Sequence, residues 1–262
     1  MSAIDWDAVA HAVQRKQPLR ELDFAGERLA GRGLAGAVFQ HCRLSGADFA
    51  DADLHTSVFL NCDLNGCDLR GCRLERTVLV DSTLDGAVLP REQILHLTLS
   101  RCRLHGLDWC EGKVSMSVFN QCDFSGADLR RLHLHRSSAI GAVLAGADLR
   151  EARLEQAALN NTDLRTTRVA GLWACNTLFM NSRLEGLDLS GLSLTQCNFD
   201  HADLSGCRLD GADLSRSLCR GIKLHGASLI GTKGENTLFL AASLEDCDAR
   251  QASFTGAIFQ EA

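Results

Sequence analysis

Twelve cysteines are the residues of this 262-residue chain with the widest range of possible chemistry. Thiolates bind metals, form disulfides and act as nucleophiles. Their spacing argues against a metal site, because the chain contains no Cys-x-x-Cys pair. The thiols recur instead in a five-residue rhythm, which favours a packing role for free thiols in a reducing cytoplasm.

Other residues that could do chemistry are few. His133 and His135 could both touch a metal, but no third ligand is in view, so we interpret them as surface residues. Glu92 would bury a charge in an inward position, and we expect local distortion around Pro90 instead. The chain has no nucleophile elbow, phosphate-binding loop or dinucleotide fingerprint. We therefore expect no catalytic, cofactor-binding or metal-binding residues, and no enzyme activity.

The elements that position these residues follow a strict repeat. Large apolar residues stand at every fifth position from Phe24 to Phe259, at 43 of 48 positions. Two places before each of them stands a second position, which holds Ala, Cys, Ser, Thr or Gly in 37 of 48 cases. Neither a helix nor an ordinary strand keeps a period of five on one face. The pattern predicts a narrow tube filled by stacked Leu and Phe side chains.

The repeat also assigns the cysteines. Cys219 takes a large inward position, whereas Cys110 and Cys175 should point outward and be the more reactive thiols. The remaining nine take the small inward position: Cys42, Cys62, Cys67, Cys72, Cys102, Cys122, Cys197, Cys207 and Cys247.

The repeated unit resembles that of the pentapeptide-repeat family. Ala47-Asp48-Phe49, Ala127-Asp128-Leu129-Arg130 and Ala202-Asp203-Leu204-Ser205-Gly206 show the small, acidic, large apolar order. The resemblance implies a right-handed quadrilateral parallel β-helix with four pentapeptides in each coil. Every twentieth residue from Gly26 is Gly in ten of twelve cases, which independently indicates a four-sided coil. We expect an all-β fold of about twelve coils, roughly 50–60 Å long.

The domain organisation follows from the limits of the repeat. We expect residues 1–22 to form a capping helix and linker, and residues 23–262 to form a single β-helix. Ser2 and Asp5 resemble a capping box, Ile4, Val9 and Val13 form an apolar stripe, and Pro18 ends the helix. With no signal peptide and no apolar run long enough to cross a membrane, we expect a soluble cytoplasmic protein.

One outer side of the predicted coil carries aliphatic residues where the repeat usually has Asp or Asn. Such a stripe is either a stacking ladder or a protein interface, and the sequence leaves both open. Trp173 is a further outward aromatic that could contact a partner. The aliphatic face consists of Val38, Val58, Val78, Val118, Leu178, Leu218, Leu238 and Ile258.

A second side is the most acidic. Some pentapeptide-repeat proteins resemble duplex DNA, bind DNA gyrase or topoisomerase IV, and protect these type II topoisomerases from quinolones or toxins. The whole chain has a net charge of only −6, with 27 Lys and Arg among 33 acids, which argues against close mimicry. It also lacks a basic patch for binding nucleic acid directly. The acidic face consists of Asp48, Asp68, Asp108, Asp128, Asp148, Asp188 and Asp248.

The last repeat ends beside Phe254, Ile258 and Phe259, which we expect to be covered by a second copy or by another protein. We therefore expect a non-catalytic interaction scaffold, in the manner of family members that resemble adaptors of bacterial secretion machinery. Its partner is a protein of unknown identity, and homodimerisation is expected. The alternative is a DNA mimic that binds a type II topoisomerase.

Overall fold

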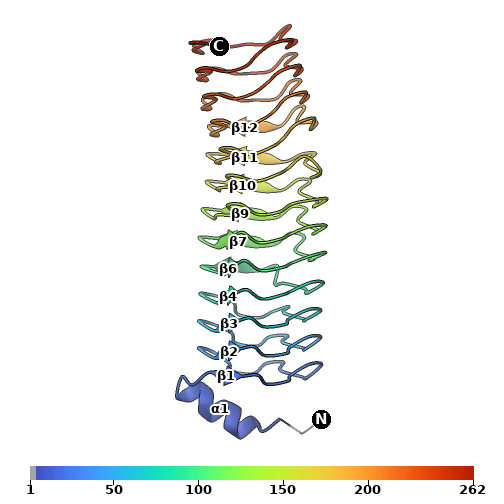
Figure 1. Ribbon diagram of the computed structural model, residues 1–262, viewed down its shortest axis with the longest axis vertical. Helices are drawn as coiled ribbons and strands as arrows, with labels where there is room; N and C mark the ends of the chain where they lie inside the picture. Colours follow the sequence, from blue (N-terminus) through green and yellow to red (C-terminus); the bar gives the residue numbers. More distant parts are fainter. Residues whose placement is uncertain (1–3) are drawn as a thin grey trace.

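A short helix lies beneath a stack of coils in the computed structural model, which describes residues 4–262 (Figure 1). The helix α1 (Trp6–Gln14) is followed by β1 (Leu19–Arg20), and the chain then winds upward to the far end of the stack. The fold is an all-β parallel solenoid with one N-terminal helix, as the repeat predicted.

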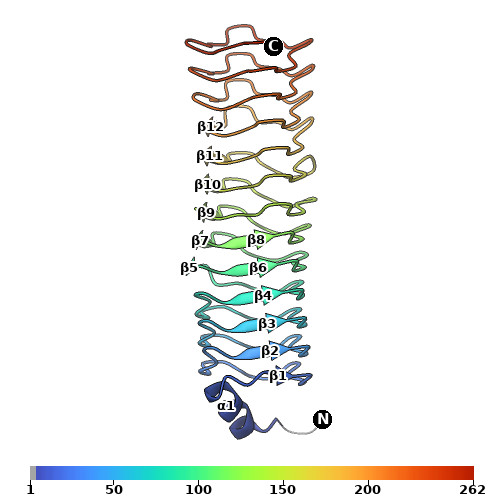
Figure 2. The ribbon, with the colours of Figure 1, turned by 60° about the vertical axis from the view of Figure 1, so that its left-hand side comes forward.

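The strands belong to two parallel sheets on different sides of the coil (Figure 2). The first sheet contains β1, β2 (Val38–Gln40), β3 (Val58–Leu60), β4 (Val78–Val80), β6 (Thr98–Ser100) and β8 (Val118–Asn120). The second contains β5 (Gln93–Leu95), β7 (Lys113–Ser115), β9 (His133–His135), β10 (Arg153–Glu155), β11 (Trp173–Cys175) and β12 (Ser193–Thr195).

Each coil pairs with the next in a register of twenty residues. Val38 pairs with Val58 and Val58 with Val78, and isolated bridges continue the same register as far as Ile258. A fixed register is possible because every side of the coil consists of one pentapeptide. Residues twenty apart therefore form continuous ladders along the rod, and each outer face can be read directly from the sequence.

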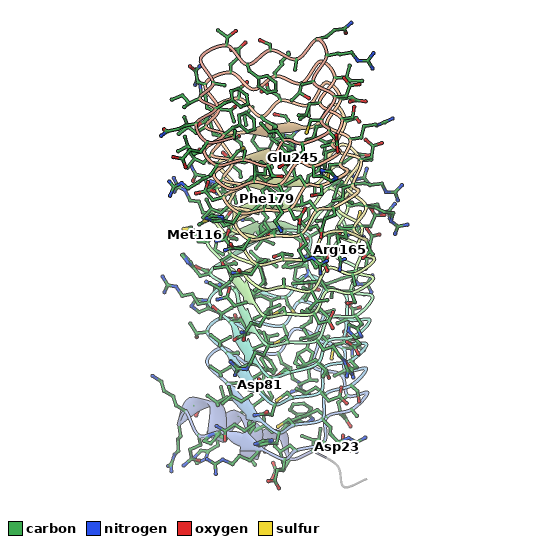
Figure 3. The ribbon with its side chains drawn as sticks, turned by 45° about the horizontal axis from the view of Figure 1, so that its top comes forward. Asp23, Asp81, Met116, Arg165, Phe179 and Glu245 are labelled. Atoms are coloured by element: carbon green, nitrogen blue, oxygen red, sulfur yellow. The ribbon has the colours of Figure 1, made fainter. Side chains whose placement is uncertain are left out.

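The interior is filled by the large residues of the repeat. Phe39 stacks on Phe59 with ring centroids 4.7 Å apart, and Phe179 stacks on Phe199 at 5.1 Å. In Figure 3, Phe179 lies inside the coils whereas the label of Met116 stands at the periphery, in agreement with the buried ring of Phe179 and the exposed side chain of Met116.

The small inward positions stabilise the wall as well as filling it. The hydroxyl of Ser57 donates to the carbonyl of Leu34 at 2.8 Å, and that of Thr77 donates to Leu54 at 2.7 Å. The thiol of Cys67 donates to Leu44 at 2.9 Å. Others bond within their own coil, as the hydroxyl of Ser82 does to the carbonyl of Val80. Ser, Thr and Cys are therefore tolerated in the core because they donate to main-chain carbonyls of the previous coil or of their own.

The helix α1 starts differently from the predicted capping box. Asp5 is the N-cap residue and accepts hydrogen bonds from the main-chain N–H groups of Asp7 and Ala8 at 3.1 and 3.0 Å. Ser2, the other residue of that prediction, lies outside the described residues. Val9 is buried against the first coil, and the guanidinium of Arg32 lies 3.6 Å from the centre of the Trp6 ring.

The segment around Pro90 departs from the regular wall. Glu92 is exposed rather than inward, which confirms the expected distortion. Trp109, in the next coil, fills the interior here and is 1% exposed. On the side of the coil that carries Gln93, the ladder of β-bridges also lapses, because Arg73 pairs with Asp53 but not with Gln93 among the described bridges. A second lapse separates Arg168 from Asp188 on another side.

No helix in residues 4–262 is long and apolar enough to cross a membrane.

Candidate protein-interaction surface

The aliphatic face follows one register of the coil, on the side of the first sheet, and is interrupted by Thr98, Ser138, Ala158 and Asn198. Val38, Val58 and Val78 lie directly above one another, so each of these side chains is partly covered by its neighbours. These three valines and Val118 are half-buried. Three members of the C-terminal half are more exposed, at 37% for Leu178, 40% for Leu218 and 49% for Ile258, whereas Leu238 is half-buried.

The ladder is widest on β3 and β4. Val58 pairs with Val78, and Leu60 pairs with Val80 on the same outer surface. Four branched aliphatic side chains thus lie together on two neighbouring strands, because residues two apart on a strand share a face. Thr98 interrupts this patch above β4. The patch contains no charged side chain, which is a property of the centre of a protein-binding surface.

Trp173 lies on the second sheet, away from the aliphatic face. It pairs with Arg153 below and Ser193 above, and its side chain is half-buried. The structure therefore places Trp173 on a different side of the coil from Val58 and Val78. A single flat partner cannot contact both at once.

The acidic face is a ladder of paired charges. The carboxylate of Asp68 lies 2.5 Å from the guanidinium of Arg70, and Asp128 lies 2.6 Å from Arg130. The remaining contacts, between 2.7 and 4.0 Å, join Asp48 to Arg28, Asp108 to Arg91, Asp148 to Arg150, Asp188 to Arg208 and Asp248 to Arg250. Every carboxylate of the predicted acidic face thus has an arginine partner.

These aspartates also hold the corners of the coil. The Oδ1 atom of Asp68 accepts the main-chain N–H of Arg70 at 3.1 Å, and Asp148 accepts that of Arg150 at 3.2 Å. The side-chain hydrogen bond from Arg150 lowers the pKa of Asp148, and that from Arg70 lowers the pKa of Asp68. The recurrent Asp is therefore explained by turn geometry, without a ligand.

The C-terminal end presents an aromatic cluster. Phe259 stacks on Phe239 with ring centroids 4.8 Å apart, and Phe254 packs edge-on against Phe259 at 5.4 Å. Phe254 is half-buried, whereas Phe259 is 45% and Ile258 49% exposed. Phe254 and Phe259 thus share the aromatic cluster at this end, whereas Ile258 belongs to the outward ladder that contains Leu238.

The cysteines divide as the repeat predicted, with one exception. Burial raises the pKa of both Cys67 and Cys72 to about 12, so these thiols remain protonated near neutral pH. Cys175 is half-buried on the outside of β11. The prediction for Cys110 was wrong, because its side chain is buried and the Arg131 guanidinium lies 3.9 Å from its sulfur.

His133 and His135 lie on the outside of β9, as predicted. The Nε2 atom of His133 lies 3.6 Å from a carboxylate oxygen of Glu155, and the Nδ1 atom of His135 lies 3.5 Å from the hydroxyl of Ser115. Within residues 4–262, no cluster of three or more His, Cys, Asp or Glu side chains has the geometry of a metal site.

Sequence reasoning located the distortion at Pro90 but missed the cavity that accompanies it. A cavity of about 230 Å³ opens in the wall between residues 72–75 and 90–95. The only sequence signals were Pro90, which cannot donate a main-chain hydrogen bond, and the charged Glu92 at an inward position.

Comparison with known proteins agrees with this architecture. A family model described as pentapeptide repeats matches eight copies, in residues 34–71, 57–91, 127–165, 177–216 and 217–256. No curated protein matches the chain significantly.

Two solved structures illustrate the similarity. A trypsin-treated variant of QnrB1, a plasmid-mediated fluoroquinolone resistance protein, is 18% identical over 75% of this chain and 90% of its own, with a TM-score of 0.51. HetL, a pentapeptide repeat protein involved in heterocyst differentiation regulation in the cyanobacterium Nostoc sp. strain PCC 7120, is 24% identical over 100% and 94%, with a TM-score of 0.27.

The likeness to QnrB1 concerns the fold. The family rests on the repeat itself, because the matched segments cover more than half of the chain and the ladders keep the register of twenty residues. This chain belongs to the pentapeptide-repeat family.

Proposed function

We propose that this protein is a non-catalytic scaffold that binds a protein partner through its aliphatic face. The observation that carries the proposal is the patch on β3 and β4, where Val58, Leu60, Val78 and Val80 present branched aliphatic side chains outward from neighbouring strands. Stacking within the ladder accounts for the half-burial of each side chain, but not for the absence of charge from the whole patch.

The physical setting supports a rigid binding surface. The paired main chains of a parallel solenoid fix the spacing of side chains along the rod. The solenoid therefore loses little conformational entropy when a partner binds. All twelve cysteines are free thiols, which supports a location in a reducing compartment such as the cytoplasm. An adaptor beside bacterial secretion machinery is the specific form of this role that the family resemblance suggests.

The test replaces Val58 and Val118 with aspartate in one variant. Both lie in the aliphatic ladder, and both side chains point away from the core, so the fold should survive. We expect a partner captured by the wild-type chain to be lost. The control variant, Ser193→Asp with Thr195→Asp, places the same two charges on the outside of β12 and should keep the partner. Equal capture by both variants contradicts the proposal.

A DNA-mimicking inhibitor of type II topoisomerases is the second candidate, supported by the fold similarity to QnrB1. A B-DNA segment of roughly 50–60 Å carries roughly 30–35 negative charges, at one per 1.7 Å. The acidic face has few carboxylates by comparison, and an arginine neutralises each of them. The scaffold role is therefore the better supported of the two.

A gyrase supercoiling assay, with and without a fluoroquinolone, separates these candidates. The scaffold role predicts no inhibition of supercoiling and no protection by micromolar protein. Inhibition that is lost when Asp128 and Asp148 are both replaced by asparagine would favour mimicry instead.

Self-association through the C-terminal end is a further part of the proposal. The Phe239, Phe254 and Phe259 rings form a cluster that a second copy could cover. We expect light scattering of the wild-type chain to give the mass of a dimer, and Phe259→Asp to give that of a monomer. A wild-type monomer at micromolar concentration contradicts this part alone.

A further inference from the structure

The wall of the solenoid has a gap on the side that carries the second sheet. On this side, Asp53 pairs with Arg73 and Gln93 pairs with Lys113, but the described bridges do not join Arg73 to Gln93. It is the one lapse in the ladder from Gly33 to Ser253 among residues 4–262. Figure 2 shows β5 as the lowest strand of this sheet, level with β6 of the first sheet.

Both main-chain hydrogen bonds that are missing at the gap would involve Gln93. In the coil below, the main-chain N–H of Leu54 donates to the carbonyl of Arg73, and the N–H of Arg73 donates to the carbonyl of Ala52, both at 3.1 Å. The corresponding bonds would join Leu74 N–H to the Gln93 carbonyl, and Gln93 N–H to the Cys72 carbonyl. Neither bond is present among the described main-chain contacts.

A cavity occupies the space that these bonds would close. Its volume is about 230 Å³, and it is lined by Cys72, Arg73, Leu74 and Glu75 on one edge and by Glu92 and Gln93 on the other. Since a water molecule takes about 30 Å³, the space holds several waters or one small molecule. It is too small for a drug-sized ligand.

The N–H group of Leu74 needs an acceptor, and the carbonyl of Cys72 needs a donor. The two partners must lie as far apart as the C=O and N–H groups of one amino-acid residue. In the regular coils, the N–H and C=O groups of a single residue supply both. The ammonium and carboxylate of a free α-amino acid stand on one carbon in the same relation. We propose that this gap binds a free α-amino acid, with its carboxylate accepting from Leu74 N–H and its ammonium donating to the Cys72 carbonyl.

The charges at the rim favour a free amino group over a peptide nitrogen. Arg73 is paired with Glu75 at 3.4 Å, and the exposed Glu92 carboxylate has no ion-pair partner among the described residues. The rim therefore has a net negative charge beside the ammonium position. The ligand would lie at an outward position of the ladder, so its side chain would point to solvent. The site would therefore not discriminate between amino acids by their side chains.

The neighbouring coil keeps the gap open. Pro90 has no N–H to pair with the wall, and its carbonyl accepts a hydrogen bond from the Trp109 indole at 3.0 Å. The displaced chain is thus tied to the coil above, and it does not collapse onto residues 72–75.

The test is a titration of the ¹⁵N-labelled wild-type chain followed by NMR. L-alanine and L-glutamine should shift the amide signals of Leu74 and Gln93 saturably, with affinities equal within a few-fold. Propionate, which lacks the ammonium group, should bind at least about tenfold more weakly, a difference of 1.4 kcal/mol or more. Millimolar L-alanine that leaves both amides unmoved shows a water-filled gap and overturns the proposal.

Two further arms identify the ligand chemistry and the site. N-acetyl-L-alanine amide keeps the N–H and C=O groups but has no charge. If it binds as tightly as L-alanine, a peptide segment is the ligand, and the proposal is overturned. The variant Glu92→Gln should weaken L-alanine binding several-fold, whereas Ser193→Ala, five coils away on the same side, should leave it unchanged.

A gap-closing variant gives an independent check. Pro90→Arg, Glu92→Cys and Trp109→Leu together restore the residues found at these positions in neighbouring coils, which are Arg70, Cys72 and Leu89. The combined variant should lose L-alanine binding while its amides of Leu74 and Gln93 become protected from hydrogen exchange. Retained binding contradicts the assignment of the site, and the wild-type titration decides the proposal even if this variant does not fold.

Discussion

The indole N–H of Trp109 donates to the carbonyl of Pro90 at 3.0 Å inside the coil, and this bond joins two irregularities of an otherwise uniform solenoid. Trp109 stands where the neighbouring coils have Leu89 and Leu129. The larger ring fits because Gly112 has no side chain. A buried indole needs a hydrogen-bond acceptor, and the displaced Pro90 carbonyl provides it.

The first prediction concerns Gly112, on which the Trp109 ring depends. A Cβ atom at residue 112 would lie 2.6 Å from the Cδ1 atom of Trp109, closer than real contacts allow. We expect Gly112→Ala to lower the free energy of unfolding by about 1–3 kcal/mol, as is typical of overpacking. The measurement is equilibrium denaturation in urea.

Gly33→Ala is the matched control, because nothing lies within 4 Å of its added Cβ and its φ is not left-handed. It should change stability by no more than about 0.5 kcal/mol. Combining Gly112→Ala with Trp109→Leu should recover much of the loss, since the clash disappears. A double variant as unstable as the sum of both singles shows that the two residues do not interact in this way.

The second prediction concerns Asp148, the most buried carboxylate of the acidic face. Its side chain is 5% exposed and lies 2.7 Å from Arg150 and 3.4 Å from Arg168. We expect Asp148→Asn to cost about 1.5–3 kcal/mol at pH 7, the range for hydrogen bonds to charged groups. Because these contacts lower the pKa of Asp148, its contribution is complete above the unfolded-state value of about 3.9.

The sign of this pH dependence distinguishes charge pairing from packing. As the pH falls through the lowered folded-state pKa, Asp148 becomes protonated and the difference between wild type and Asp148→Asn should disappear. Asp188→Asn is the control, since that side chain is 63% exposed and its pair with Arg208 should contribute about 1 kcal/mol or less. A difference at Asp148 that persists at pH 2 means that shape, not charge, sets its cost.

The sequence allowed the ladders of this fold to be predicted because one rule repeats without insertion. A period of five assigns inward and outward positions, and a period of twenty assigns neighbours, so the pairing of Val58 with Val78 followed from their numbers alone. Few folds connect sequence distance to spatial distance so directly.

Side-chain partners could not be predicted in the same way. Arg70 turns back onto Asp68 within its own coil, whereas Arg208 reaches Asp188 in the coil below, and the repeat contains both possibilities. Cys110 is buried, with the Arg131 guanidinium 3.9 Å from its sulfur, and the repeat does not specify that contact. A periodic pattern predicts the position of each residue on the coil, but not whether an irregular neighbouring segment buries its side chain.

The last prediction concerns which thiols react under native conditions. Only the thiolate reacts with iodoacetamide, so the raised pKa of about 12 at Cys67 and Cys72 should protect both near pH 8. Cys175 is half-buried on the outer surface, and we expect it to be labelled first. Peptide mapping by mass spectrometry after brief labelling measures the order. Cys175→Ser should abolish the early label, and Cys110→Ser should leave it unchanged because that thiol is buried. Early labelling of Cys110 would mean that the coil wall opens there in solution, because its side chain is buried.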